Sequence, residues 1–103
     1  MAEWVTVGKA EDIVEGDATA YDVNGEEIAV ARADGALYAF SDVCTQRRCN
    51  LSSGGEIDGT TIECECHGSV FDLVTGEALE GPATEPIAVY PVSDDSGDLR
   101  IQA

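Results

Sequence analysis

Basic residues are scarce in this sequence, which has five Lys and Arg against 21 Asp and Glu and a formal net charge of −16. A phosphate backbone and anionic lipids would both repel so acidic a surface, so we expect neither nucleic acid nor a membrane as a partner. The charge favours protein partners with basic docking faces, which long-range attraction would steer into contact. A general solubility surface or a high-salt habitat is the alternative explanation.

Long apolar runs are also missing. The opening residues, Met1-Ala2-Glu3-Trp4, are not basic and no apolar run follows them, so we expect no signal peptide, no membrane span and a cytoplasmic location. Four cysteines in a chain of 103 residues could form two disulfides. Without an export signal, metal binding or redox chemistry is the better expectation for them.

No segment repeats apolar residues at helical spacing between caps, so helices are not expected. Short runs of β-forming residues alternate instead with turn dipeptides such as Asn24-Gly25, a strong hairpin signal because both central turn positions need positive φ. About eight or nine such strands predict an all-β antiparallel sandwich or barrel, and the length fits one domain over residues 1–103. The expected strands cover residues 4–7, 19–23, 27–32, 36–40, 56–57, 60–63, 70–73, 87–92 and 99–101.

Two segments interrupt the strand pattern and carry the reactive side chains. Residues 44–51 (CTQRRCNL) follow one expected strand, and residues 64–69 (CECHGS) follow another. Thiolate and imidazole bind iron well, and two hairpin tips can face each other across a small cluster. The sequence has no nucleophile–base pairing and no phosphate-binding loop, so we do not expect an enzyme.

The region 42–71 resembles the cluster-binding motif of the Rieske family, which reads Cys-x-His, then about 15 to 17 residues, then Cys-x-x-His. In this chain 17 residues, 47–63, separate Gln46 from Cys64. The resemblance extends to the Gly-Ser-Val-Phe-Asp run, the Thr-Gly-Glu turn and the Gly-Pro-Ala segment at 81–83. It implies a Rieske-type antiparallel β-sandwich with a small cluster-binding subdomain of two loops.

Within that family the chain resembles the soluble ferredoxins that serve ring-hydroxylating dioxygenases. This likeness implies a [2Fe-2S] cluster and a one-electron carrier between a flavin-dependent reductase and a terminal oxygenase. Such a protein is a component of a multicomponent oxygenase system and not an enzyme in its own right. Its reduction potential is expected at the low end of the Rieske range of about −150 to +300 mV.

The resemblance also implies the metal ligands. Cys44 and Cys64 would bind one iron through sulfur, and His67 would bind the other through a ring nitrogen. Gln46 occupies the fourth position, where the family has its second histidine. A neutral amide oxygen is a poor donor beside imidazole, so the cluster is expected to be more labile and to have an altered potential.

Further residues match the family around the cluster. Gly68 and Ser69 resemble residues that hydrogen-bond cluster sulfur, and Pro82 resembles the proline of the covering loop. Cys49 and Cys66 match the pair that forms a disulfide between the loops in high-potential Rieske proteins. In a reducing cytosol these two thiols could stay open, and each could also be a small buried hydrophobe.

Several outcomes stay open at position 46. The Gln46 oxygen could bind weakly, Cys49 or Cys66 could supply a third thiolate, or water or buffer could fill the position. The cluster could also be absent, leaving a clusterless Rieske-like interaction or structural subunit, and an engineered ligand substitution would explain the pattern as well. A structural zinc site built from the cysteines and His67 is a third alternative, although Cys-x-Cys-His does not match the usual paired zinc knuckles.

Overall fold

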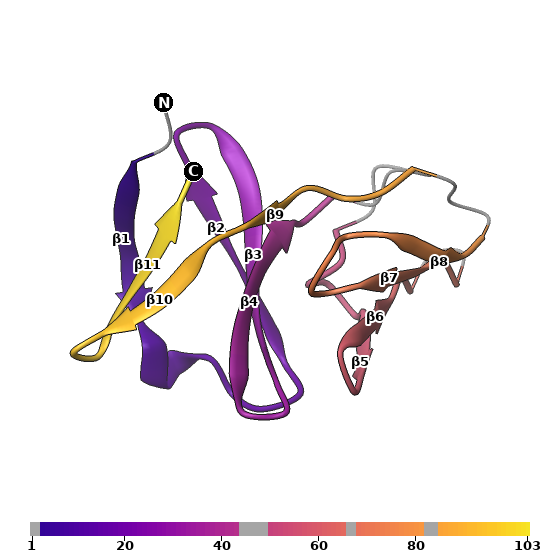
Figure 1. The fold of residues 1–103 in the computed structure, drawn as a ribbon, viewed down its shortest axis with the longest axis horizontal. Coiled ribbons are helices and arrows are strands. Elements are labelled where there is room, and N and C mark those ends of the chain that lie inside the picture. The colour runs from indigo at the N-terminus through magenta and orange to yellow at the C-terminus, as the bar shows by residue number, and fades with distance from the viewer. Residues whose placement is uncertain (1–2, 44–49, 66–67, 82–84) are drawn as a thin grey trace.

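The computed structural model describes residues 3–43, 50–65, 68–81 and 85–103. These residues form three antiparallel sheets arranged as a larger base and a smaller subdomain (Figure 1). The base contains the sheets β1-β11-β10 and β2-β3-β4-β9, and the subdomain is the sheet β5-β6-β7-β8. The strands are β1 (Trp4–Lys9), β2 (Ala18–Val23), β3 (Glu26–Ala33), β4 (Ala36–Ser41), β5 (Glu56–Asp58), β6 (Thr61–Glu63), β7 (Val70–Asp72), β8 (Ala78–Glu80), β9 (Val89–Tyr90), β10 (Val92–Asp95) and β11 (Asp98–Gln102).

The prediction of an all-β antiparallel fold with a small two-loop subdomain is confirmed. Helical structure in the described ranges is one 3-10 turn, η1 (Ala10–Asp12), so no helix there has the length and apolar character needed to cross a membrane. The chain leaves the base at the end of β4, builds the subdomain, and returns to the base at β9 (Figure 1).

Three tight hairpins form at turn dipeptides, the predicted Asn24-Gly25 among them. In each, the first turn residue adopts a left-handed backbone and glycine follows it, also at positive φ: Asn24 (φ 53) before Gly25, Asp34 (φ 52) before Gly35, and Ser96 (φ 54) before Gly97. These angles belong to the two-residue turn whose twist matches that of the flanking strands.

The expected single strand over residues 87–92 is wrong in one respect, because the chain changes sheets there. β9 pairs with β4, whereas β10 pairs with β11 in the other base sheet, and Pro91 lies between them. Proline has no N–H to donate to a ladder, so the pairing is interrupted at that residue. The short strand β8 was not expected, and the described residues contain eleven strands instead of eight or nine.

Strand β3 places the subdomain close to the base. Its alternate residues face opposite sides, with Ile28 and Val30 in the cluster between the two base sheets and Ala29, Ala31 and Ala33 in the cluster beneath the subdomain. The small alanine side chains allow the subdomain core to approach the sheet closely. That core contains Phe40, Leu51, Ile62, Cys64, Phe71, Leu73 and Ile87.

Candidate metal centre

The first predicted loop is closed at its base by backbone pairing. β4 ends at Ser41, and Val43 forms an isolated antiparallel bridge with Asn50, which brackets residues 44–49. The Leu51 N–H donates to the Asp42 carbonyl oxygen at 2.6 Å. The outgoing limb of this loop, residues 42–43, therefore runs beside its returning limb, residues 50–52.

A buried carboxylate strengthens this closure. Asp42 is fully buried and accepts hydrogen bonds from Asn50 Nδ2 at 2.8 Å, Ser52 N at 2.7 Å and Ser52 Oγ at 2.9 Å. A buried charge is tolerated when it is this fully hydrogen-bonded. Asp42 thus joins the outgoing limb of the loop to the returning limb.

The second predicted loop is a tight turn after β6. Cys64 follows this strand directly, its N–H donates to the Ser69 carbonyl oxygen at 2.7 Å, and its own carbonyl oxygen accepts from the Gly68 N–H at 3.0 Å. Gly68 has φ 75, a left-handed conformation that suits glycine at this turn. Cys64 is only 2% exposed and Ser69 is buried, so the base of the loop is shielded from water.

The bases of the two loops pack against each other through a pair of glycines. A Cβ on Gly55 would overlap the Leu51 carbonyl oxygen and lie 3.2 Å from the Glu63 carbonyl oxygen. A Cβ on Gly54 would overlap the Glu65 carboxylate. The returning limb of the first loop therefore lies directly against the strand that leads to Cys64, which is the arrangement needed for two loops to hold one metal centre.

A cavity of about 300 Å³ opens beside Cys64. It is lined by Gly54, Glu56, Glu63, Cys64, Glu65 and Gly68. A larger groove of about 500 Å³ on the base is lined by uncharged residues of β4, β9, β10 and the β7–β8 turn, and offers no thiol or imidazole. The smaller cavity is therefore the one associated with the candidate centre.

Among the predicted site residues, Cys64, Gly68 and Ser69 are described and lie together in the second loop. The other six, which are Cys44, Gln46, Cys49, Cys66, His67 and Pro82, lie outside the described residues. Within the described ranges no group of three or more His, Cys, Asp and Glu side chains is placed to hold a metal ion. The ligand set therefore stays a prediction.

The described part of the site fits an iron–sulfur cluster. It provides a buried cysteine that lines a cavity, and glycines at positions where the two loop bases lie close together. The predicted donors, thiolate sulfur and imidazole nitrogen, are those that Rieske centres use. Sequence reasoning missed Asp42 and Gly55, although an Asp two residues before the first cysteine and a paired glycine after the loop were visible signals.

Comparison with known proteins decides the family. The Rieske [2Fe-2S] domain model matches residues 3–91. The chain belongs to the Rieske [2Fe-2S] domain family. The predicted extent of one Rieske domain over residues 1–103 stays a prediction.

Relatives of this Rieske protein include ferredoxins of dioxygenase systems. The ferredoxin component of the naphthalene 1,2-dioxygenase/salicylate 5-hydroxylase systems of Ralstonia sp is 40% identical over 89 residues, which are 86% of this chain and 85% of that protein. The structure of the Sphingomonas yanoikuyae B1 ferredoxin is similar with a TM-score of 0.90 at 31% identity, over 98% of this chain and 99% of that chain.

A third similarity is to a chain in the complex of reduced oxygenase and oxidized ferredoxin in carbazole 1,9a-dioxygenase. Its TM-score is 0.89 at 33% identity, over 96% of this chain and 92% of that one. Together these findings confirm the predicted family, its [2Fe-2S] cofactor and a ferredoxin-type electron carrier instead of an enzyme.

Proposed function

We propose that this Rieske protein carries single electrons from a flavin-dependent reductase to the terminal oxygenase of a ring-hydroxylating dioxygenase system. The observation that carries the proposal is the extent of the structural similarity. It covers 98% of this chain and 99% of the solved Sphingomonas yanoikuyae B1 ferredoxin, so one small Rieske fold accounts for nearly all of both. The cavity beside the buried Cys64 supports a cluster-binding role for this part of the chain. We also propose a cytoplasmic location for this ferredoxin-type protein.

In this proposal Cys44 and Cys64 hold one iron, His67 holds the other, and Gln46 occupies the fourth position. When bound, the [2Fe-2S] cluster supplies the one-electron redox chemistry. The chain's own described residues hold the base of the second loop in place. The N–H of Gly68 fixes the turn after Cys64, and burial of Cys64 and Ser69 excludes water from the loop base.

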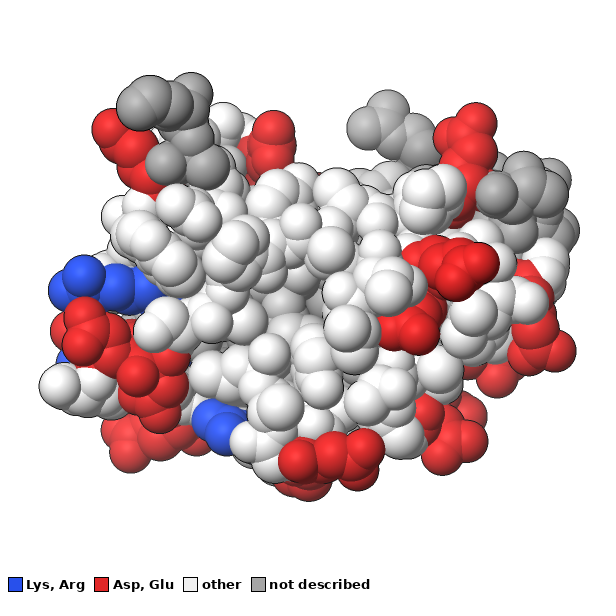
Figure 2. Space-filling model, in the orientation of Figure 1, with Lys and Arg blue, Asp and Glu red and all other residues white. Residues whose placement is uncertain are grey.

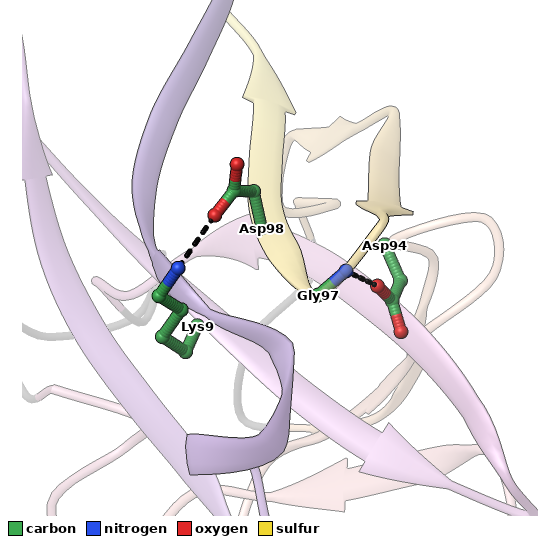
Figure 3. Close-up of polar contacts among 4 residues, drawn as sticks. All are labelled: Lys9, Asp94, Gly97 and Asp98. Atoms are coloured by element: carbon green, nitrogen blue, oxygen red, sulfur yellow. Dashed lines mark hydrogen bonds and ion pairs between the residues drawn. The ribbon is translucent and has the colours of Figure 1, made fainter.

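The acidic surface supports partners with basic docking faces. The described cations are all engaged within the chain: Lys9 pairs with Asp98 at 2.8 Å (Figure 3), and Arg100 pairs with Asp95 at 3.4 Å. Arg32 donates to two backbone carbonyl oxygens at the 3-10 turn, at 2.8 and 2.9 Å. Acidic side chains therefore far outnumber cations, 21 against 5, and acidic side chains border the face seen in Figure 2.

Position 46 is the feature that sets this protein apart from the family motif. We propose that the cluster is present but more labile than in relatives with histidine there, because an amide oxygen is a weak iron ligand. The test uses Gln46→His, which restores the histidine of the motif. This variant should lose its cluster more slowly and give a different EPR spectrum from the parent protein.

The proposal is tested on protein purified without oxygen. Iron and acid-labile sulfide should each be present at about two per chain, with a Rieske-type visible spectrum and an EPR signal after one-electron reduction. Iron-free and sulfide-free protein, even after cluster reconstitution, would instead indicate a clusterless interaction module. In that case Cys64→Ala should leave partner binding unchanged. Zinc without iron would indicate a structural zinc site.

A further inference from the structure

The base of the first loop contains a fully buried carboxylate, Asp42, which is not one of the positions of the Cys-x-His and Cys-x-x-His pattern. We propose that Asp42 is a positioning residue, whose carboxylate clamps the two limbs of this loop together and thereby controls how firmly the cluster is retained. The inference rests on the proposed function, because it takes Cys44, two residues after Asp42, as a ligand.

The clamp uses both oxygens of the carboxylate. Oδ1 accepts from the Ser52 N–H at 2.7 Å, and Oδ2 accepts from Asn50 Nδ2 at 2.8 Å and Ser52 Oγ at 2.9 Å. Bonds to an ionised acceptor are about twice as strong as neutral ones. All three donors lie on the returning limb, so every one of these bonds spans the loop.

Asp42 is also tied to the rest of the fold. Its N–H donates to the Glu27 carbonyl oxygen of β3 at 2.9 Å, and the neighbouring Ser41 N–H donates to the Ala88 carbonyl oxygen at 2.8 Å. Residues 41–42 therefore join the base sheet, the first loop and the segment that returns to β9. A shift of Asp42 would be transmitted to the first residues of the loop.

A buried carboxylate is a costly choice if its only task is to stabilise the fold, because well-packed apolar residues often do as well. What a carboxylate can do, and an apolar side chain cannot, is accept several hydrogen bonds at once and so fix their donors in one geometry. Asparagine has nearly the same shape, but it offers a single acceptor oxygen and its NH₂ group would face the donors. Asp42→Asn therefore tests the clamp with little change in volume.

The experiment compares cluster-loaded proteins in anaerobic buffer with an iron chelator. For Asp42→Asn we expect cluster absorbance to decay about 10- to 100-fold faster than in the parent, on the scale by which metal affinity falls when groups that orient metal ligands are removed. The EPR spectrum of the still-loaded fraction should be shifted or broadened, which a merely structural role would not produce. Ser52→Ala, which removes one of the three donors, should accelerate decay in the same direction by less.

The matched control is Asp72→Asn. Asp72 is another turn-capping aspartate of the subdomain, accepting from Val74 N at 2.7 Å and Thr75 N at 3.3 Å, but its turn joins β7 to β8. This variant should keep the parent's EPR spectrum and decay rate. Equal acceleration in Asp72→Asn, or parental decay and EPR in Asp42→Asn, would overturn the inference. If Asp42→Asn does not fold, Ser52→Ala becomes the test. A Ser52→Ala protein that loses its cluster at the parent's rate would then overturn the inference.

Failure of the inference and failure of the proposed function give different results. A parent protein that never takes up iron and sulfide would refute the proposed function. A loaded parent whose Asp42→Asn variant behaves identically would refute only the role of Asp42. The double variant Asp42→Asn with Asn50→Asp exchanges the amide and the carboxylate. It should recover part of the lost cluster retention, because one amide-to-carboxylate hydrogen bond again joins the two limbs.

Discussion

Replacing Gly55 by alanine tests whether the contact between the two loop bases supports the subdomain. The added Cβ would overlap the Leu51 carbonyl oxygen and lie 3.2 Å from the Glu63 carbonyl oxygen. Both neighbours are backbone atoms, so no side chain can rotate away, and the returning limb of the first loop has to move. Gly55 is not among the residues with positive φ, so the effect comes from crowding and not from backbone strain.

The magnitude follows from three contributions. Overpacking costs about 1–3 kcal/mol. Displacing the limb also weakens the hydrogen bond from the Gly55 N–H to the Leu51 carbonyl oxygen, 3.1 Å long, which contributes about 0.5–1.5 kcal/mol. The lower entropy of the unfolded alanine chain offsets about 0.4–1 kcal/mol. The net loss of stability is about 2 kcal/mol, which corresponds to a fall in Tm of roughly 10 °C for a domain of this size.

The assay is thermal unfolding followed by far-ultraviolet circular dichroism, at one heating rate for all variants. Gly8→Ala is the control, because a Cβ at Gly8 would meet only the Tyr21 side chain, at 3.4 Å or more. Its Tm should stay within about 3 °C of the parent, which matches an ordinary surface substitution. A Gly55→Ala protein that melts with the parent would show that the loop bases do not touch as described, and the reasoning would fail.

Three other predictions concern the core, Tyr90 and the surface charge. Phe71→Ala, at a fully buried position, should destabilise the fold by about 3–5 kcal/mol in thermal unfolding, and an effect no larger than that of the exposed control Val74→Ala would contradict the packing. Burial, the Glu26 charge and the hydrogen bond to Glu26 raise the pKa of Tyr90 above 10.0, so the stability present below about pH 10 should be lost as pH rises through the folded pKa. Tyr90→Phe should reduce this alkaline loss, measured by unfolding at a series of pH values, and an unchanged slope would contradict it. Electron transfer to a basic haem protein should slow as ionic strength rises, measured by stopped flow, and a salt-independent rate would exclude steering by the acidic surface.

Local chemistry made most of the strand pattern predictable from the sequence. Asn24-Gly25 and Asp34-Gly35 place left-handed conformations at two adjacent positions, and only a tight hairpin uses both. The alternation of large and small apolar residues in β3 likewise follows from the two faces of a strand. The two cysteine-bearing loops could be located for the same reason, because they interrupt runs whose structure is determined by near neighbours.

The sequence by itself therefore determined the hairpins, the all-β class and the family motif, since each depends on residues close together in the chain. Only the tertiary structure decided where the chain changes sheets at Pro91, that Asp42 binds Asn50 and Ser52, and that Gly55 lies against Glu63. These features are contacts between segments brought together by folding. An aspartate or a glycine has the same local preferences whether or not such a partner arrives, so its neighbours in the sequence do not reveal the contact.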